Sequence, residues 1–308
     1  MNNEHNRPPH DRPGTLRGRA RQRILSGTAA LPSLVTLGNG LAGFASIHFA
    51  TRTISRSMTE AGADKILSAD LVLAAWLILA GMLCDALDGQ LARLTRRTSD
   101  FGAQLDSLCD AITFGVAPAI LMLRAVQPDL AWYVGDVDIT PQAAFIGRVV
   151  WFIGAMFAAC TILRLARFNV ETKPDALSHM NFWGLPSPGA ALAVASLVLA
   201  HEHLELHQAS WNLPAWVLHA VIWAMPIVTL AAAVLMVTRI RYPHLVNRQL
   251  RGRRTFGHIV RLLVLVLAAI MVGLKISLAV GALLYLAVPP IVWLIHVVQG
   301  RPGPVKQA

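Results

Sequence analysis

Four aspartates with helical spacing, Asp85, Asp88, Asp106 and Asp110, form the part of this sequence best suited to chemistry. They lie in the segment DALDGQLARLTRRTSDFGAQLDSLCD, residues 85–110, which apolar stretches flank on both sides. Because a helix has 3.6 residues per turn, the first two aspartates share one helix face and the last two share another. Two helices that meet at the basic loop would bring all four carboxylates into one cluster, with a glycine on each helix leaving room for a ligand.

Such a cluster needs cations, and ligation by oxygen atoms alone favours Mg²⁺ or Mn²⁺ over zinc. Two ions about 4 Å apart can clamp a pyrophosphate and stabilise a leaving phosphate, while one carboxylate accepts the proton of an attacking hydroxyl. Neither a Ser-His-Asp nor a Cys-His arrangement accompanies the aspartates, so we expect direct in-line displacement at phosphorus. In the alternative reading, the aspartates pair with the loop arginines Arg93, Arg96 and Arg97 and only hold two helices together.

The elements that must position these residues are membrane helices. Of the 308 residues, 55% are hydrophobic and only 14% are charged, with a mean hydropathy of +0.53, whereas a soluble domain carries about 25% charged residues. A span requires roughly 20 apolar residues, and the apolar runs predict an all-α polytopic membrane protein with about eight transmembrane helices. The predicted spans are residues 31–50, 71–91, 101–123, 143–163, 185–200, 213–237, 256–273 and 276–298.

The formal net charge of +10 is carried mainly by the segments between these spans. This distribution is typical of the positive-inside rule and of contact with anionic lipid, not of nucleic-acid binding. We therefore expect both termini and the open side of the aspartate cluster to face the cytosol, in the plasma membrane of a bacterium. The expected organisation is a disordered basic cytosolic tail (1–30), a catalytic core (31–243), a cytosolic loop with two further membrane helices (244–298) and a cytosolic tail (299–308).

The chain resembles the CDP-alcohol phosphotransferase family at every fixed position of its signature, D-x₂-D-G-x₂-A-R-x₈-G-x₃-D-x₃-D, from residue 85 to residue 110. The resemblance implies a six-helix core, usually in a homodimer, that transfers a phosphatidyl or similar group from a CDP-linked donor and releases CMP. It also implies that the four aspartates hold two divalent metal ions, Mg²⁺ or Mn²⁺, and that Asp110 accepts the proton. Gly89, Arg93 and Ser99 match positions that hold the donor.

Five blocks outside the signature narrow the resemblance to the branch of the family whose acceptor is serine. They are residues 31–44, 106–119, 164–169, 184–191 and 238–243. The implied substrates are CDP-diacylglycerol and L-serine. In the third block, Arg164 or Arg167 would bind the serine carboxylate or the donor phosphates, because a guanidinium can hold two oxygens at once, and Asn169 is a further candidate. Anchoring of these arginines at the cytosolic face is the alternative.

Two positions depart from the family pattern. Ser33 stands where asparagine is usual. Thr113 stands where serine is usual, so Thr113 must supply the hydroxyl if one is needed there. The signature itself does not separate acceptor alcohols, so glycerol phosphate, inositol phosphate and choline remain alternatives to serine. A cation-coupled transporter is the alternative from another class, although the aspartates crowd one membrane edge and no inverted halves are evident.

Overall fold

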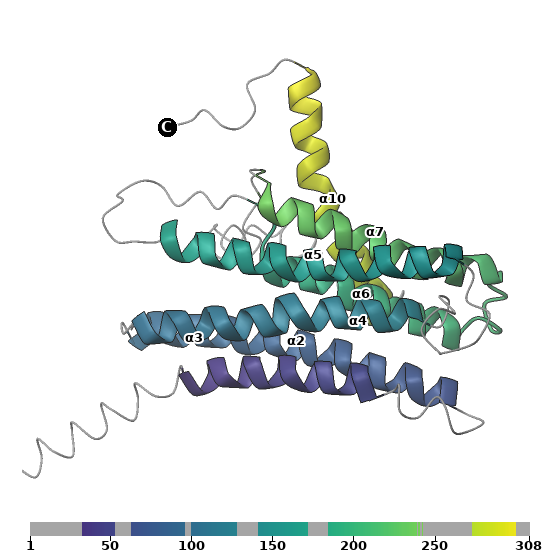
Figure 1. The fold of residues 1–308 in the computed structure, drawn as a ribbon, viewed down its shortest axis with the longest axis horizontal. Coiled ribbons are helices and arrows are strands. Elements are labelled where there is room, and N and C mark those ends of the chain that lie inside the picture. The colour runs from purple at the N-terminus through teal and green to yellow at the C-terminus, as the bar shows by residue number, and fades with distance from the viewer. Residues whose placement is uncertain are drawn as a thin grey trace, which may run out of the picture.

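A computed structural model describes residues 33–52, 63–95, 100–127, 141–171, 184–238, 240, 242 and 273–299. Within these ranges the chain forms helices and no strand (Figure 1). A first helix spans residues 33–52. It is followed by α2 (Ala63–Thr95), α3 (Asp100–Asp110), the π-helical turn η2 (Ala111–Val116), α4 (Ala117–Val126), α5 (Pro141–Glu171), α6 (Ser187–Leu206), α7 (Ala215–Val237) and α10 (Leu274–Val298).

Six helical segments are long and apolar enough to cross a membrane: Ala69–Leu91, Phe101–Val126, Phe145–Val170, Ser187–Leu206, Ala215–Val237 and Leu274–Val298. They overlap six of the eight predicted spans, which confirms an all-α polytopic membrane protein. The first predicted span coincides with the helix at 33–52. The seventh, 256–273, lies outside the described residues except for its last position, so the count of eight stays a prediction. The fifth span was predicted to end at residue 200, but α6 continues for more than a turn, to Leu206.

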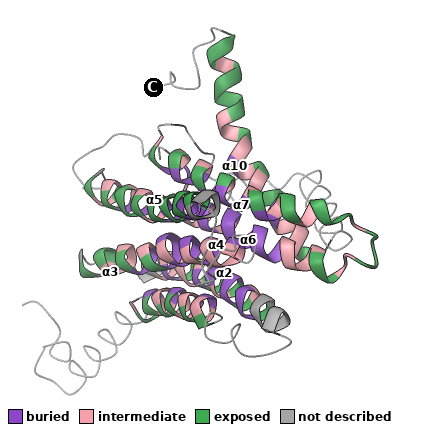
Figure 2. Ribbon diagram, turned by 45° about the vertical axis from the view of Figure 1, so that its right-hand side comes forward, coloured by how far each residue is buried: buried purple, intermediate pink, exposed green. Residues whose placement is uncertain are grey.

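The centre of the bundle is α6, which packs against α2, α4, α7 and α10. Its buried residues between Ala190 and Ala200 are mostly alanine, valine and serine. Small side chains allow neighbouring helices to approach closely, which is how apolar helices associate where burial from water provides no driving force. The last helix, α10, differs in that only Ala279, Ala282 and Leu286 are buried, all in its first half. Figure 2 shows exposed residues along the part of α10 that projects beyond the bundle.

The helix at 33–52 packs closely against α2 and η2, and two glycines make this possible. A Cβ atom at Gly43 would lie 2.7 Å from the Cα atom of Thr113, and one at Gly81 would lie 2.5 Å from its Cγ2 atom. Both distances are too short for real carbon atoms, so any larger residue would push the helices apart. The close approach places the first helix directly beside the aspartate-bearing helices.

The third predicted span is not one regular α-helix, because η2 interrupts it immediately after Asp110. The residues of η2 that point into the bundle, Thr113, Phe114 and Gly115, are fully or almost fully buried. The Thr113 hydroxyl donates a hydrogen bond of 2.8 Å to the backbone carbonyl of Asn39 in the first helix. Single π-helical turns occur frequently at functional sites, and this one directs Thr113 towards the first helix.

Candidate active site

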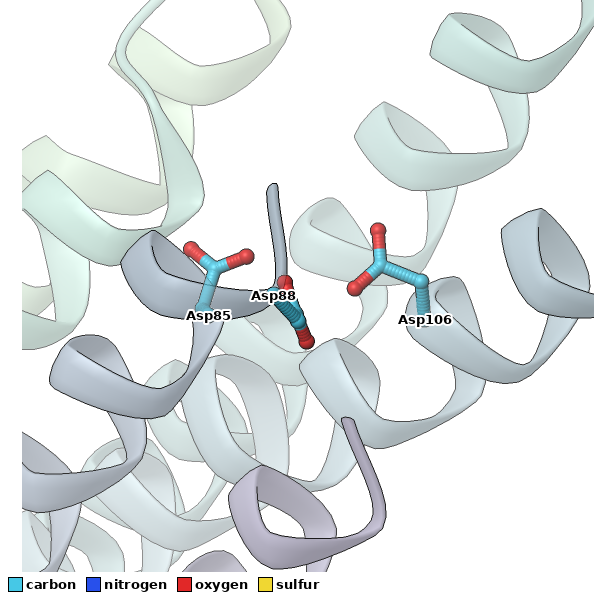
Figure 3. Close-up of side chains that lie close together, drawn as sticks. All are labelled: Asp85, Asp88 and Asp106. Carbon is cyan, nitrogen blue, oxygen red and sulfur yellow. The ribbon is translucent and has the colours of Figure 1, made fainter. Parts of the chain in front are cut away.

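Three of the four predicted aspartates converge where α2 meets α3. Asp85 and Asp88 extend from α2 and Asp106 from α3, and one oxygen of each lies within 4.8 Å of the others. Figure 3 shows the three carboxylates facing a common space. Asp88 is buried, and the other two are half-buried. Among the described residues, this is the one set of three or more aspartate, glutamate, histidine or cysteine side chains that could hold a metal ion.

The donor set fits a divalent cation. Oδ2 of Asp88 and Oδ1 of Asp106 are buried and have no hydrogen-bond partner. Buried carboxylate oxygens without partners are costly, and so are like charges held close together. Mg²⁺ forms bonds of about 2.1 Å to oxygen and prefers carboxylates, so small side-chain rotations would let these oxygens bind one ion. The alternative pairing with Arg93, Arg96 and Arg97 concerns side chains outside the described residues.

Asp110 lies one helical turn beyond Asp106 and is buried. Its carboxylate interacts electrostatically with Asp85 and Asp106. One of its oxygens, Oδ1, accepts a hydrogen bond of 2.8 Å from the side-chain amide of Asn39. The structure therefore places the fourth aspartate next to the cluster but gives it a partner from a different helix.

The first helix holds a second carboxylate in the same way, since the Thr36 hydroxyl hydrogen-bonds to Asp88. Neither Thr36 nor Asn39 was among the predicted site residues. A signal was present in the sequence, because Asn39 is a polar residue between Gly38 and Gly40 in an apolar run, and polar residues inside membrane segments are usually functional. Which carboxylate each would hold depends on packing and could not be read from that signal.

Gly89 borders open space beside the carboxylates, because a Cβ atom added there would meet no atom within 4 Å. This matches the prediction that a glycine on α2 leaves room for a ligand. The other two predicted donor-binding residues cannot be placed in the same way. Arg93 belongs to α2, but its side chain is not described, and Ser99 lies outside the described residues.

Arg164 of α5 points into the bundle. Its Nη1 atom donates a hydrogen bond of 3.0 Å to the hydroxyl of Ser187, the first residue of α6. Its Nε atom is buried and has no partner, and the guanidinium interacts electrostatically with Asp110 and Tyr285. A side chain that only anchored the protein at the membrane surface would extend towards lipid head groups. Arg164 therefore lies within the bundle, and its role in binding a substrate stays a prediction.

The other two candidates of the same block lie on α5 beyond Arg164. Asn169 and Ser107 bond to each other, with Asn169 Nδ2 donating to Ser107 Oγ at 2.9 Å and Ser107 Oγ 3.2 Å from Asn169 Oδ1. This pair ties α5 to α3 beside Asp106. Arg167 is half-buried on the same helix.

The helical membrane bundle and the converging carboxylates define an integral-membrane enzyme of the phosphotransferase class. Over residues 29–228 the sequence matches the family described as CDP-alcohol phosphatidyltransferase. This match covers more than half of the chain and includes all four aspartates, and the chain therefore belongs to that family.

Several known proteins are similar to the chain. It is 32% identical over 213 residues to the CDP-diacylglycerol–serine O-phosphatidyltransferase of Helicobacter pylori. The matched region covers 69% of this chain and 71% of that protein. It is 34% identical over 216 residues to the archaetidylserine synthase of Methanothermobacter thermautotrophicus, or 70% of each chain. The chain is also 30% identical to the CDP-diacylglycerol–serine O-phosphatidyltransferase of Mycobacterium tuberculosis. This match extends over 185 residues, which are 59% of this chain and 53% of that protein.

Proposed function

We propose that the chain transfers the phosphatidyl group of CDP-diacylglycerol to the hydroxyl of L-serine and releases CMP. The names of the three relatives described above all include serine, whereas the lipid named differs between the M. thermautotrophicus enzyme and the other two. The observation that carries the proposal is the position of Arg164, a half-buried cation that interacts electrostatically with Asp110 and whose buried Nε atom lacks a partner.

Serine constrains where its carboxylate can bind. Only two carbon atoms separate the hydroxyl oxygen from the carboxylate carbon, so a cation that holds the carboxylate must lie beside the group that accepts the hydroxyl proton. The electrostatic interaction between Arg164 and Asp110 supports this arrangement. A guanidinium also presents several N–H donors in a plane, which suits a carboxylate. Arg167 and Asn169 are further candidates for binding serine or phosphate, from the same end of α5.

In the proposed reaction the serine hydroxyl oxygen attacks the phosphorus that carries the diacylglycerol. A new oxygen–phosphorus bond forms, the bond from that phosphorus to CMP breaks, and CMP leaves with the bonding electrons. Asp110 accepts the hydroxyl proton. Asn39 occupies Oδ1 of this carboxylate, which leaves Oδ2 available for the proton.

The carboxylates of Asp85, Asp88, Asp106 and Asp110 would hold two divalent ions, Mg²⁺ or Mn²⁺. Bound there, the ions would neutralise the pyrophosphate and stabilise the leaving CMP. Gly89 leaves space for the donor, and Arg93 and Ser99 would bind its phosphates. We propose that the site and both termini face the cytosol, and that two copies of the chain form a homodimer.

CMP release by the purified enzyme tests the proposal. The enzyme in detergent would receive CDP-diacylglycerol and Mg²⁺ with serine, glycerol 3-phosphate, inositol phosphate or choline, and the lipid product would be identified by mass spectrometry. We expect CMP and phosphatidylserine in equal amounts with serine only, and no release by the Asp110→Asn variant. CMP release with another alcohol but not with serine would show that the enzyme uses a different acceptor. No CMP release with any alcohol would overturn the proposal.

A further inference from the structure

The C-terminal helix α10 lies beyond the matched family region, which ends at residue 228, yet it is integrated into the bundle. Its buried face, formed by Ala279, Ala282 and Leu286, packs against the central helix α6. Figure 1 shows α10 crossing α6 and α7 before it projects away. The contact between Tyr285 of α10 and Gly189 of α6 places this crossing close to the first turn of α6, where Arg164 binds Ser187.

Tyr285 is the large side chain of α10 at this crossing, and it is held from two sides. A Cβ atom at Gly189 would lie 2.9 Å from its Cε1 atom, so the ring packs on the bare backbone of α6. On another side, the ring of Tyr242 meets it edge to face, with centroids 5.6 Å apart. The Tyr242 hydroxyl donates to the backbone carbonyl of Leu286 at 3.2 Å, so it points to the α10 backbone.

The phenol of Tyr285 interacts electrostatically with the Arg164 guanidinium. Arg164 uses Nη1 to bind Ser187, and its buried Nε atom has no partner. The guanidinium interacts with Asp110 as well. Arg164 thus interacts both with a carboxylate beside the cluster and with α10.

We propose that Tyr285 determines acceptor specificity, by binding the carboxylate of the acceptor together with Arg164. This inference rests on the proposed function, since it assigns a further residue to the serine subsite. A carboxylate has about four acceptor positions and a phenol supplies one O–H donor, so both side chains can bind the same group. An acceptor without a carboxylate would leave the buried Nε atom of Arg164 and the hydroxyl of Tyr285 without this partner, and sites that hydrogen-bond a substrate group strongly reject analogues that lack it.

The decisive comparison is between Tyr285→Phe and Tyr242→Phe. The first variant removes one oxygen from the ring that packs on Gly189, and the second removes the same atom from the neighbouring ring. We expect Tyr285→Phe to raise the KM for serine roughly 3- to 10-fold, while kcat and the KM for CDP-diacylglycerol each change less than about twofold. Tyr242→Phe should leave all three constants within about twofold of the wild type.

A double-mutant cycle with Arg164→Lys tests whether both residues bind the same group. If they do, the KM for serine in the double variant rises by less than the product of the two single effects. A rise equal to that product would overturn the inference, as would an unchanged KM in Tyr285→Phe or an equal rise in Tyr242→Phe. Tyr285→Leu is a second hydroxyl-free variant, expected to change the KM in the same direction if the phenylalanine variant fails to accumulate.

These outcomes separate the inference from the proposed function. If the wild-type enzyme releases CMP with another alcohol but not with serine, the proposed function fails first. If serine is the acceptor but Tyr285→Phe and Tyr285→Leu behave like the wild type, the specificity role of Tyr285 fails and the proposed function stands. Ethanolamine, which is serine without its carboxylate, provides a third reading. Its use relative to serine should rise several-fold in Tyr285→Phe, and an unchanged ratio would count against the inference.

Discussion

The side-chain amide of Asn39 donates a hydrogen bond of 2.8 Å to Oδ1 of Asp110, joining two helices whose residues are 71 positions apart. Asn39 is completely buried, and Thr113 binds its backbone carbonyl. The two bonds hold the asparagine at both its side chain and its backbone. They orient the carboxylate that we propose as proton acceptor.

Replacement of Asn39 by alanine should therefore reduce kcat more than it changes the KM for serine. The Asp110 carboxylate would lose its only described side-chain donor and could rotate away from the acceptor hydroxyl, and we expect kcat to fall about 10- to 100-fold. Ser46→Ala is the matched control, because Ser46 lies in the same helix and its buried hydroxyl donates to the carbonyl of Ala74 at 2.8 Å. Equal losses of kcat in the two variants would show that Asn39 only supports packing.

Removal of metal should abolish CMP release, and the carboxylates of the cluster should set the metal concentration that restores it. We expect chelation by EDTA to stop the reaction and Mg²⁺ or Mn²⁺ to restore it. Asp106→Asn should raise the Mg²⁺ concentration for half-maximal activity at least about tenfold, since one charged oxygen ligand is lost. The assay is a metal titration of CMP release after chelation.

Asp70→Asn is the control for this titration. Asp70 is also a buried aspartate of α2, but it forms an ion pair with Arg52, whose Nε atom lies 3.7 Å from Oδ2. Its replacement should leave the metal requirement unchanged, although the protein could lose stability. A metal requirement that shifts equally in both variants would show that the effect comes from helix packing and not from ligation.

Two glycines of α2 should respond in opposite ways to a methyl group. Gly89→Ala should fold normally, because a Cβ atom there meets nothing within 4 Å, whereas Gly81→Ala forces a contact of 2.5 Å with Thr113. We expect Gly81→Ala to lose about 1–3 kcal/mol of stability, measured as a lower melting temperature in detergent. We expect Gly89→Ala to keep its melting temperature but to bind CDP-diacylglycerol more weakly, with a KM several-fold higher. A normal KM would mean that the donor binds elsewhere.

The helices and the three converging aspartates were predictable because they depend on local pattern. Apolar runs of sufficient length determine a span, helical spacing places Asp85 and Asp88 on neighbouring positions of α2, and the few residues between α2 and α3 keep Asp106 near them. The roles of Thr36 and Asn39 were not predictable, because they depend on how closely the first helix packs on α2 and on the segment of α3 and η2. Gly43 and Gly81 permit this close packing, and no local pattern reports it.

The π-helical turn after Asp110 was missed for a related reason. Residues 111–116 are apolar apart from Thr113, and such a run predicts a regular helix. The distortion depends on contacts with other helices, namely the bond from Thr113 to the first helix and the packing of Gly115 against Thr161, where a Cβ atom would lie at 3.2 Å. The link between Arg164 and Tyr285 likewise joins helices that are distant in the sequence.

Arg164 provides the test that bears most directly on serine as the acceptor. Arg164→Ala should raise the KM for serine at least about tenfold, because a charged hydrogen-bonding partner of the carboxylate is lost. Arg164→Lys keeps the charge without the planar pair of donors and should give an intermediate value. Arg124→Gln is the matched control, since Arg124 of α4 bonds to the nearby Gln127 at 2.6 Å. If Arg164→Ala and Arg164→Lys both keep the wild-type KM for serine, Arg164 does not bind the acceptor. The carboxylate must then be held by another cation.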